Sequence, residues 1–387
     1  MKMFFIGARF LVFLLVFLSA SHAFAQSVVV DCTGDTPGAF TSLETAILNS
    51  PDNSSFSVSG TCAEGLSIQN RSNLVIFGNP TATLQPPVDH PAVSILASRS
   101  ITFFNVNFSG GDLGLGINSS QNVSFSNMTQ SGASAFGISS IDSIVHVSTS
   151  SITGNVRTGI VVNGGTFYLD GAVNVNSNGR LGLSAGSNSH LLLSDGSGPN
   201  IISHNGLSGV QIFGTSHGDF SGDNEITNNN TTNAAGQFGL LVQSNSGLIM
   251  DGGTISSNAG LGVACDLHSQ CQISDAQVNS NLGDGVDIIE HSSATFGNTT
   301  VSHNSGTGVL VDQGSSLSTG GDTIASNTGD GLVLNTLSSL NFLTPDTITP
   351  SVGNLALNCN NGSMVEGDVS TYKPKKCGTQ FQNNPIH

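Results

Sequence analysis

The stretch VNSNLGDGVDIIEH, residues 278–291, contains a pattern that occurs four times in this chain of 387 residues. The other copies are ISSNAGLGVACD (residues 255–266), VSHNSGTGVLVD (residues 301–312) and IASNTGDGLVLN (residues 324–335). Each copy has an N-x-G-x-G sequence followed by alternating apolar residues, and its asparagine recurs every 23 residues. A fixed period in the twenties is typical of a solenoid, in which each repeat forms one coil.

The residue types of the repeat distinguish between two kinds of solenoid. Leucine-rich repeats need an L-x-x-L-x-L-x-x-N pattern, which this sequence lacks. Short alternating runs of Val and Ile between Ser, Thr, Asn and Gly are typical of strands and turns. We therefore predict an all-β protein that forms a parallel β-helix of about a dozen coils. The polar segment NNNTTNAAGQ (residues 228–237) lengthens one repeat and is predicted to form a loop.

Alternation along each predicted strand assigns residues to the inside or the outside of the solenoid. In the central copy, Val286 and Ile288 are predicted to point inward, and Asp287 and Ile289 to point to solvent. Coils in such a fold lie about 4.8 Å apart, so equivalent positions form columns along the axis. The repeated asparagines are expected to stack, with their amides bonding one coil to the next.

The N-terminal residues predict export. Lys2 and Arg9, an apolar run over residues 10–18 and an A-x-A site form a secretory signal peptide over residues 1–25, with cleavage before Gln26. The apolar run is too short to cross a bilayer. We expect a secreted protein, extracellular or periplasmic, with no membrane span.

Charge restricts the partners of the exported chain. After removal of residues 1–25, seven basic and 25 acidic residues leave a net charge near 7 − 25 = −18. Such a surface repels the phosphates of nucleic acids and disfavours an anionic polysaccharide. A neutral polysaccharide or a component of a cell surface is the partner that this charge allows.

Six cysteines in an exported chain predict disulfides. Proximity in sequence suggests three pairs, Cys32–Cys62, Cys265–Cys271 and Cys359–Cys377, although six cysteines allow 15 connectivities. We divide the chain into the signal peptide (residues 1–25), an N-terminal cap with the first coil (26–80), the β-helix (81–358) and a disulfide-tied tail (359–387).

The segments VVVDCTGDTPGAFTSLETAI (residues 28–47), VSGTC (58–62) and NLVIFGN (73–79) resemble the start of right-handed parallel β-helix proteins of the pectate-lyase-like superfamily. The resemblance implies a right-handed solenoid whose open end is closed by a short helix. Thr41 would be the N-cap of that helix and Glu44 would complete a capping box.

The catalytic motifs of two enzyme groups with this fold do not transfer to this chain. The N-T-D, D-D, G-H-G and R-I-K motifs of polygalacturonases are absent. Pectate lyases place a basic residue beside calcium-binding aspartates, but this sequence has no Lys or Arg between Arg180 and Lys373. The resemblance therefore indicates the fold and leaves the activity open.

Acidic residues on successive coils form the first candidate site. Asp266, Asp287 and Asp312 are predicted to share one outward face, and Glu290 and His291 follow Asp287. Carboxylates about 6.5–9.5 Å apart suit an inverting glycosidase. The same carboxylates could hold Ca²⁺ or could form a solvated acidic surface. All three interpretations stay open from the sequence.

A second cluster lies in GTSHGDFSGDNEIT, residues 214–227, directly before the polar loop. Asp219, Asp223 and Glu225 are candidate ligands for Ca²⁺, although their spacing is not that of an EF-hand. His217 belongs to the same stretch, and the repeat stacks His190 below it. No motif in the sequence requires a cofactor.

Three functions are compatible with these observations. The first is a secreted β-helix protein that contacts extracellular polysaccharide, with or without catalysis. The second is a glycoside hydrolase that uses Asp266, Asp287 and Asp312. The third is a structural or adhesive surface protein with no enzymatic activity. The mature chain has no Trp and only two Tyr, so the large aromatic surface that often holds sugars is sparse.

Overall fold

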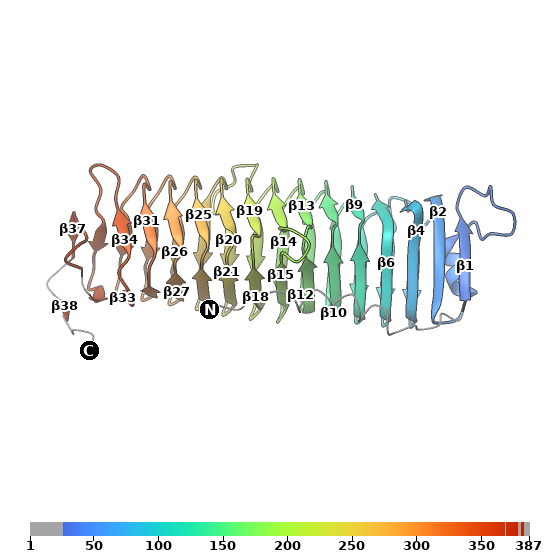
Figure 1. Cartoon of the computed structure of the whole chain (residues 1–387), viewed down its shortest axis with the longest axis horizontal. Helices are drawn as coiled ribbons and strands as arrows, with labels where there is room; N and C mark the ends of the chain where they lie inside the picture. Colours follow the sequence, from blue (N-terminus) through green and yellow to red (C-terminus); the bar gives the residue numbers. More distant parts are fainter. Residues whose placement is uncertain (1–25, 368, 378–380, 383–387) are drawn as a thin grey trace, which may run out of the picture.

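The computed structural model describes residues 26–367, 369–377 and 381–382, and the predicted signal peptide lies outside these residues. The described chain is an elongated β-solenoid of about 14 coils (Figure 1). The coils follow one another along the long axis in sequence order, so each coil packs mainly on the coil before it and the coil after it. The predicted all-β parallel solenoid is confirmed.

Each coil contributes strands to three ladders of parallel strands, which we name A, B and C. Ladder A holds the strands that follow the N-x-G-x-G turn. Its strands are β3 (Leu66–Gln69), β5 (Val93–Leu96), β7 (Leu115–Asn118), β10 (Ile138–Ser148), β12 (Ile160–Asp170), β14 (Leu183–Gly186), β17 (Val210–Ile212), β20 (Phe238–Val242), β23 (Leu261–Cys265), β26 (Val286–Ile288), β29 (Val309–Val311), β32 (Leu332–Leu334), β35 (Leu357–Cys359) and β37 (Lys375–Lys376).

Ladder B follows ladder A within each coil and includes the C-terminal parts of β10 and β12. Its other strands are β1 (Gln26–Asp31), β2 (Ser54–Cys62), β4 (Ser72–Leu84), β6 (Arg99–Ser109), β8 (Gln121–Ser126), β15 (His190–Ser194), β18 (His217–Ser221), β21 (Gly247–Asp251), β24 (Gln270–Ser274), β27 (Ser293–Gly297), β30 (Ser316–Thr319), β33 (Ser339–Phe342), β36 (Met364–Glu366) and β38 (Phe381–Gln382).

Ladder C closes each coil and begins with the C-terminal parts of β2, β4 and β6. It continues through β9 (Thr129–Ser131), β11 (Ser151–Thr153), β13 (Asn174–Asn176), β16 (Ile201–Ser203), β19 (Glu225–Thr227), β22 (Thr254–Ser256), β25 (Gln277–Asn279), β28 (Thr300–Ser302), β31 (Thr323–Ala325) and β34 (Thr347–Thr349).

The core is one apolar column that runs the length of the solenoid. Val286 and Ile288 are almost fully buried, and Val286 pairs in register with Val263 and Val309 in the neighbouring coils, as predicted. Because the strand period is two, one residue of each pair enters this column and the next faces outward.

Asparagine amides join eight successive coils at the turn before ladder A. Each amide nitrogen donates to the side-chain oxygen of the next asparagine at 2.8–3.1 Å, and that oxygen also accepts a backbone N–H. The series comprises Asn155, Asn178, Asn205, Asn229, Asn258, Asn281, Asn304 and Asn327. It confirms the expected stacking and satisfies backbone groups that the buried turn would leave unpaired.

Close packing explains the second glycine of the repeat. A Cβ atom at Gly285 would lie 2.5 Å from the carbonyl oxygen of Gly308 in the next coil and 2.4 Å from the Val301 side chain. The neighbouring backbone therefore allows no side chain at this position. The repeated glycines let the coils approach one another at the turn.

A short helix, α2 (Leu43–Leu48), packs at the N-terminal end of the solenoid, as the resemblance implied. Its N-cap is Ser42 instead of the predicted Thr41, because the Ser42 hydroxyl accepts the Thr45 N–H. Glu64, which is distant in sequence, accepts the Leu43 N–H and the Ser42 hydroxyl, both at 2.6 Å. The cap is thus completed by a carboxylate that local sequence patterns do not identify.

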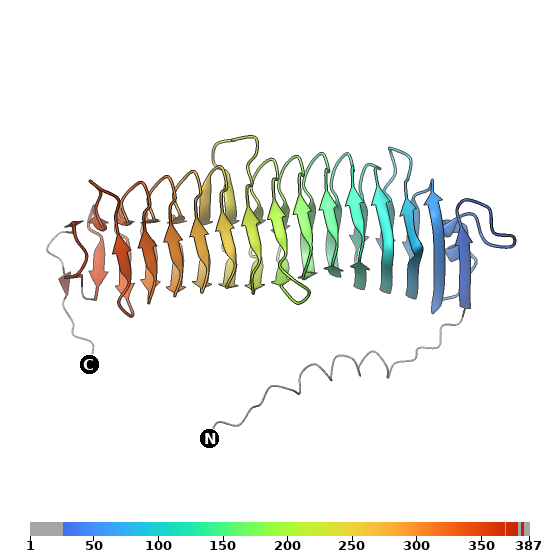
Figure 2. The same ribbon diagram turned by 45° about the horizontal axis from the view of Figure 1, so that its top comes forward.

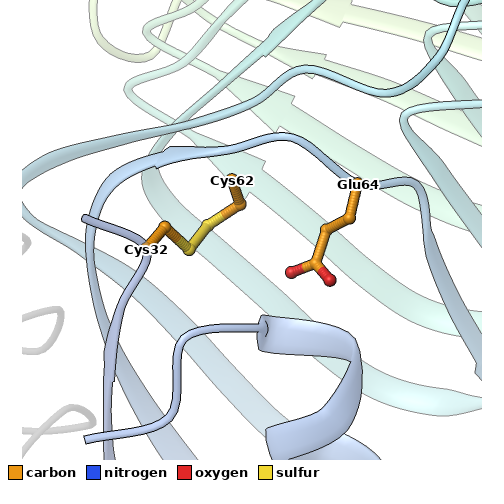
Figure 3. Close-up of side chains that lie close together, drawn as sticks. All are labelled: Cys32, Cys62 and Glu64. Atoms are coloured by element: carbon orange, nitrogen blue, oxygen red, sulfur yellow. A yellow bond between two sulfur atoms is a disulfide. The ribbon is translucent and has the colours of Figure 1, made fainter. Parts of the chain in front are cut away.

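The three disulfides join the cysteines that proximity suggested, Cys32–Cys62, Cys265–Cys271 and Cys359–Cys377. Figure 3 shows the first of them beside Glu64 at the N-terminal cap. Three disulfides indicate an oxidising compartment.

Two further features complete the architecture. The polar loop of residues 228–237 joins β19 to β20 and projects beyond the other turns in Figure 2. None of the helices in the described part of the chain has the length and apolar character needed to cross a membrane.

Candidate functional site

The predicted acidic face lies on ladder A, around strands β23, β26 and β29. Asp266 and Asp312 stand at equivalent positions two coils apart, directly after β23 and β29. Each accepts the backbone N–H of the residue that follows it, at 2.7 Å for Leu267 and 2.6 Å for Gln313. Both aspartates therefore help to form the turn that leads into ladder B.

Asp287 departs from its predicted exposure. It occupies the outward position of β26 between Ala264 and Leu310, yet it is only 7% exposed. Its Oδ1 atom is buried, and no N–H or O–H group among the described residues donates to it. An outward position on this strand is therefore not a solvent-exposed one, and the prediction that Asp287 points freely to solvent is wrong.

The ionisation partner of Asp287 is Asp284, three residues earlier in the same coil. The two carboxyls are hydrogen-bonded, which requires a proton on one of them. Burial, the negative charge of Asp284 and the hydrogen bond to Asp284 together raise the pKa of Asp287 to about 8, and burial is the largest of these causes. The Asp284 carboxylate also accepts the Thr307 N–H at 2.6 Å. Asp287 thus carries the shared proton at neutral pH and donates it toward Asp284.

Glu290 and His291 lie in the turn after β26, both with a left-handed backbone conformation. The His291 ring stacks on His268 of the preceding coil, with ring centroids 5.4 Å apart. Asp266 has a raised pKa, caused first by burial and also by the charge of Glu290. Asp266, Glu290 and His291 therefore lie on the same region of the surface as Asp287 and Asp312, and among the described residues there only Asp284 and Asp287 form a hydrogen-bonded carboxyl pair.

The second predicted cluster is divided between two ladders. Asp219 lies in β18 of ladder B, whereas Glu225 lies in β19 of ladder C and Asp223 in the turn between them. The Asp223 N–H donates to Asp195 at 3.3 Å. Asp219, Asp223 and Glu225 do not converge among the described residues, so their predicted Ca²⁺ site stays a sequence-based prediction without a shared ligand geometry.

Asp219 instead lies between two histidines. His190 and His217 are paired in register on β15 and β18, as the repeat predicted. The Nε2 atom of His190 lies 2.7 Å from one Asp219 oxygen, and the Nε2 atom of His217 lies 2.9 Å from the other. Burial alone would raise the pKa of Asp219, but the hydrogen bonds from both histidines lower it. Asp219 is thus an ionised carboxylate held between two imidazoles.

A pair of stacked rings lies nearby on the same face of ladder B. His146 and Tyr168 stack almost in parallel, with ring centroids 4.1 Å apart. The Nδ1 atom of His146 lies 2.9 Å from Asp170. Tyr168, Leu192 and Asp219 occupy one register position on three successive coils. The rings and the His–Asp–His cluster therefore share one outward surface.

A shallow groove of about 290 Å³ continues this surface toward the C-terminus, across β21, β24 and β27. It begins at His217, and polar side chains of the next strands line it together with Ile249. The polar lining residues are Gln270, Gln272, Ser293 and Thr295. Amides and hydroxyls at coil spacing are groups that hydrogen-bond to neutral hydroxylated ligands.

Another groove, of about 440 Å³, lies on ladder A beside the polar loop. Its lining includes Arg180, Gln211, Gln237, Phe238 and Leu241. The loop forms one wall of this groove, because Gly236 and Gln237 belong to it. It is distinct from the carboxyl pair of Asp284 and Asp287, which is absent from its lining.

Two features of these surfaces escaped the sequence analysis. Asp284 was overlooked because it precedes the strand, although it lies only three positions before Asp287. The His146–Tyr168 stack is not predicted because the N-x-G-x-G pattern, on which the sequence analysis relies, is absent from these coils. The 22-residue spacing between His146 and Tyr168 is the signal that would have placed the rings one above the other.

Comparisons with known proteins agree with this architecture. Residues 171–324 match the family model described as right handed beta helix region. No protein of curated function shows a significant sequence match. The A-module of mannuronan C-5 epimerase AlgE4 from Azotobacter vinelandii has a similar structure, with a TM-score of 0.55 and 13% identity over 84% of this chain and 93% of that chain.

A viral protein has a similar structure. The receptor-binding tailspike protein of bacteriophage Det7 has a TM-score of 0.51 and 11% identity, over 91% of this chain and 78% of its own. At these identities the likeness concerns the fold alone. Together, the strand ladders, the family model over residues 171–324 and the structural matches show that this chain has the fold of a right-handed parallel β-helix.

Proposed function

We propose that this protein binds a neutral extracellular polysaccharide along the outward surface of ladder B. The observation that carries the proposal is the polar groove across β21, β24 and β27, which continues the surface formed by His217, Asp219 and Tyr168. From β12 to β27 this surface extends over five coil steps, or about 24 Å at about 4.8 Å per coil. That length matches a short oligosaccharide laid along the axis.

The chemistry of the surface favours a neutral glycan. Gln270 and Gln272 offer amide donors and acceptors, and Ser293 and Thr295 offer hydroxyls, at successive coils. Tyr168, whose ring face stacks on His146, adds an aromatic edge and a hydroxyl to the same surface. Such groups bind hydroxyls without needing a charge on the ligand.

Charge distinguishes this ligand from the substrate named for one structural neighbour. Mannuronan, on which the AlgE4 epimerase acts, is a chain of uronic acids and is anionic. The present chain has a net charge of −16 and no Lys or Arg between Arg180 and Lys373, a segment that includes the whole groove. Repulsion between like charges therefore favours a neutral polysaccharide over a polyuronate.

A binding panel tests this proposal. Neutral glycans such as xylan, mannan and β-glucan are compared with alginate and polygalacturonate by calorimetry and affinity electrophoresis. We expect a neutral glycan to bind, and the double variant Gln270→Ala/Gln272→Ala to bind it more weakly. Gln277→Ala, an equally exposed change on ladder C, is the matched control and should leave affinity unchanged.

Two outcomes of the panel would overturn the proposal. Binding of polyuronates without binding of neutral glycans would contradict the proposed preference of ladder B for neutral polysaccharide. Absence of all glycan binding would favour the structural or adhesive alternative, in which another protein meets this surface.

A second candidate function is glycoside hydrolysis on ladder A, which the pKa of about 8 at Asp287 favours. A carboxyl that stays protonated at neutral pH is suited to act as a general acid. Asp266 lies on the adjacent coil two positions away, a diagonal of about 7–8 Å, and would serve as the base. Release of new reducing ends by the wild type and its loss in Asp287→Asn would support this function, whereas equal release by both proteins would exclude it.

A further inference from the structure

We infer that His190, His217 and Asp219 form a binding site for a divalent transition-metal ion such as Zn²⁺. The inference goes beyond glycan binding and does not depend on it. Two imidazole nitrogens and a carboxylate oxygen lie within 4.8 Å of one another, on adjacent strands of a rigid ladder. Imidazole and carboxylate ligands in a set of three are typical of zinc sites that keep a position open.

The distances fit a site that has to open only slightly. Bonds of about 2.0–2.2 Å in a tetrahedral arrangement place the ligand atoms about 3.3–3.5 Å from one another. The two nitrogen–oxygen distances are now 2.7 and 2.9 Å. These contacts run to different oxygens of Asp219, so an ion would enter between the two rings and the carboxylate once each nitrogen–oxygen distance lengthens by about half an ångström.

The protonation states are those that a metal needs. A ligating imidazole must present an unprotonated nitrogen and a carboxylate must be ionised. Asp219 accepts a contact from each imidazole and so presents both of its oxygens as acceptors. Both histidines direct Nε2, and not Nδ1, at the carboxylate. Each histidine can therefore keep its present rotamer when the metal ion binds.

The surroundings leave a position for a further ligand. The side chains of His190, His217 and Asp219 are 38–41% exposed, so water can reach the ion. The coil above contributes Gly247, where a Cβ atom would lie 2.5 Å from Nδ1 of His217. Glycine at this position leaves room for the imidazole ring and for the groove that starts beside it.

The ligand set distinguishes this ion from Ca²⁺. Calcium takes six to eight oxygen ligands, and only Asp219 supplies oxygens here. Nitrogen ligands instead favour Zn²⁺, Cu²⁺, Ni²⁺ or Co²⁺, with affinities that follow the general order for first-row metals. We therefore expect Asp219 to bind a metal ion together with His190 and His217, and not together with Asp223 and Glu225.

Calorimetry with ZnCl₂ on the mature, tag-free chain tests the inference, together with the melting temperature with and without Zn²⁺. We expect one Zn²⁺ per chain, a higher melting temperature and weaker binding at pH 5.5 than at pH 7.5. His190→Gln and Asp219→Asn should each abolish stoichiometric binding. His146→Gln is the matched control, because His146 faces Asp170 on the same ladder with tyrosine, and not a second histidine, as its stacked neighbour.

Each outcome bears on the inference. Loss of binding in His190→Gln and Asp219→Asn, with binding kept in His146→Gln, supports it. Absence of stoichiometric Zn²⁺ and Cu²⁺ binding by a folded wild type overturns it, and so does undiminished binding by His190→Gln. Circular dichroism of every variant shows whether the solenoid is intact, so that a folding defect is not mistaken for loss of a ligand.

Discussion

Replacement of Asp287 by Asn should stabilise the protein at neutral and alkaline pH. Asp287 is 7% exposed, and its pKa is about 8 in the folded chain against 3.8 for an unperturbed aspartate. The unfolded chain releases this proton near pH 4, whereas the folded chain keeps it until about pH 8. Because the folded pKa is raised, the contribution of Asp287 to stability is fully present below pH 4 and is lost as the pH rises toward 8.

The size of the effect follows from the difference between the two pKa values. At pH 7 the interval is 7 − 3.8 = 3.2 pH units, which at about 1.36 kcal/mol per unit corresponds to about 4 kcal/mol. Asp284 shares the titration, so we expect roughly 2–4 kcal/mol of added stability in Asp287→Asn. An asparagine amide can donate to Asp284 as the protonated carboxyl does, and it needs no proton from solvent.

Chemical denaturation at pH 5, 7 and 9 measures this effect. We expect the free energy of unfolding of the wild type to fall over this range more steeply than that of Asp287→Asn, with the two proteins closest at pH 5. Asp275→Asn, a change at an exposed aspartate between β24 and β25, is the control and should follow the wild type. Parallel pH profiles for the wild type and Asp287→Asn would refute the shared proton.

Three further changes test the architecture. Val286→Asp places an unpaired charge in the core and should abolish cooperative thermal unfolding followed by circular dichroism, whereas an unchanged melting curve would contradict the register. Asn281→Leu leaves buried N–H groups of the adjacent coil without an acceptor and should lower the free energy of unfolding in urea by about 1–3 kcal/mol. An unchanged urea midpoint would show that the asparagine series does not stabilise the fold. Loss of the Cys265–Cys271 disulfide should destabilise the protein by about 1 kcal/mol less than loss of Cys32–Cys62, because it closes a shorter loop. The reverse order of the two unfolding midpoints would contradict this prediction.

The fold is predictable from the repeat because one pattern fixes three things at once. The 23-residue period sets the length of a coil, the alternation after Gly285 separates core from surface, and Asn281 marks the turn shared by the eight coils of the asparagine series. Each of these is a local property of the sequence that repetition reinforces. The cap is less predictable, since its N-terminal groups are satisfied by Glu64, about twenty residues away from the helix.

The candidate sites are less predictable because they depend on side-chain surroundings. Alternation correctly places Asp287 outside the core, but it does not reveal that Ala264, Leu310 and Asp284 leave the carboxyl almost inaccessible. Likewise, three acidic residues close in sequence suggested a calcium site at Asp219. In the structure His190 lies beside Asp219 although 29 residues separate them in sequence, whereas Glu225 lies on ladder C.

The most direct test of glycan binding on ladder B is a crystal structure of the protein with the neutral oligosaccharide that binds most tightly in the panel. We predict that the sugar chain lies along the solenoid axis over β21, β24 and β27, with hydroxyls bonded to Gln270 and Gln272. A sugar chain seated instead on ladder A, in the groove beside the polar loop of residues 228–237, would contradict the account.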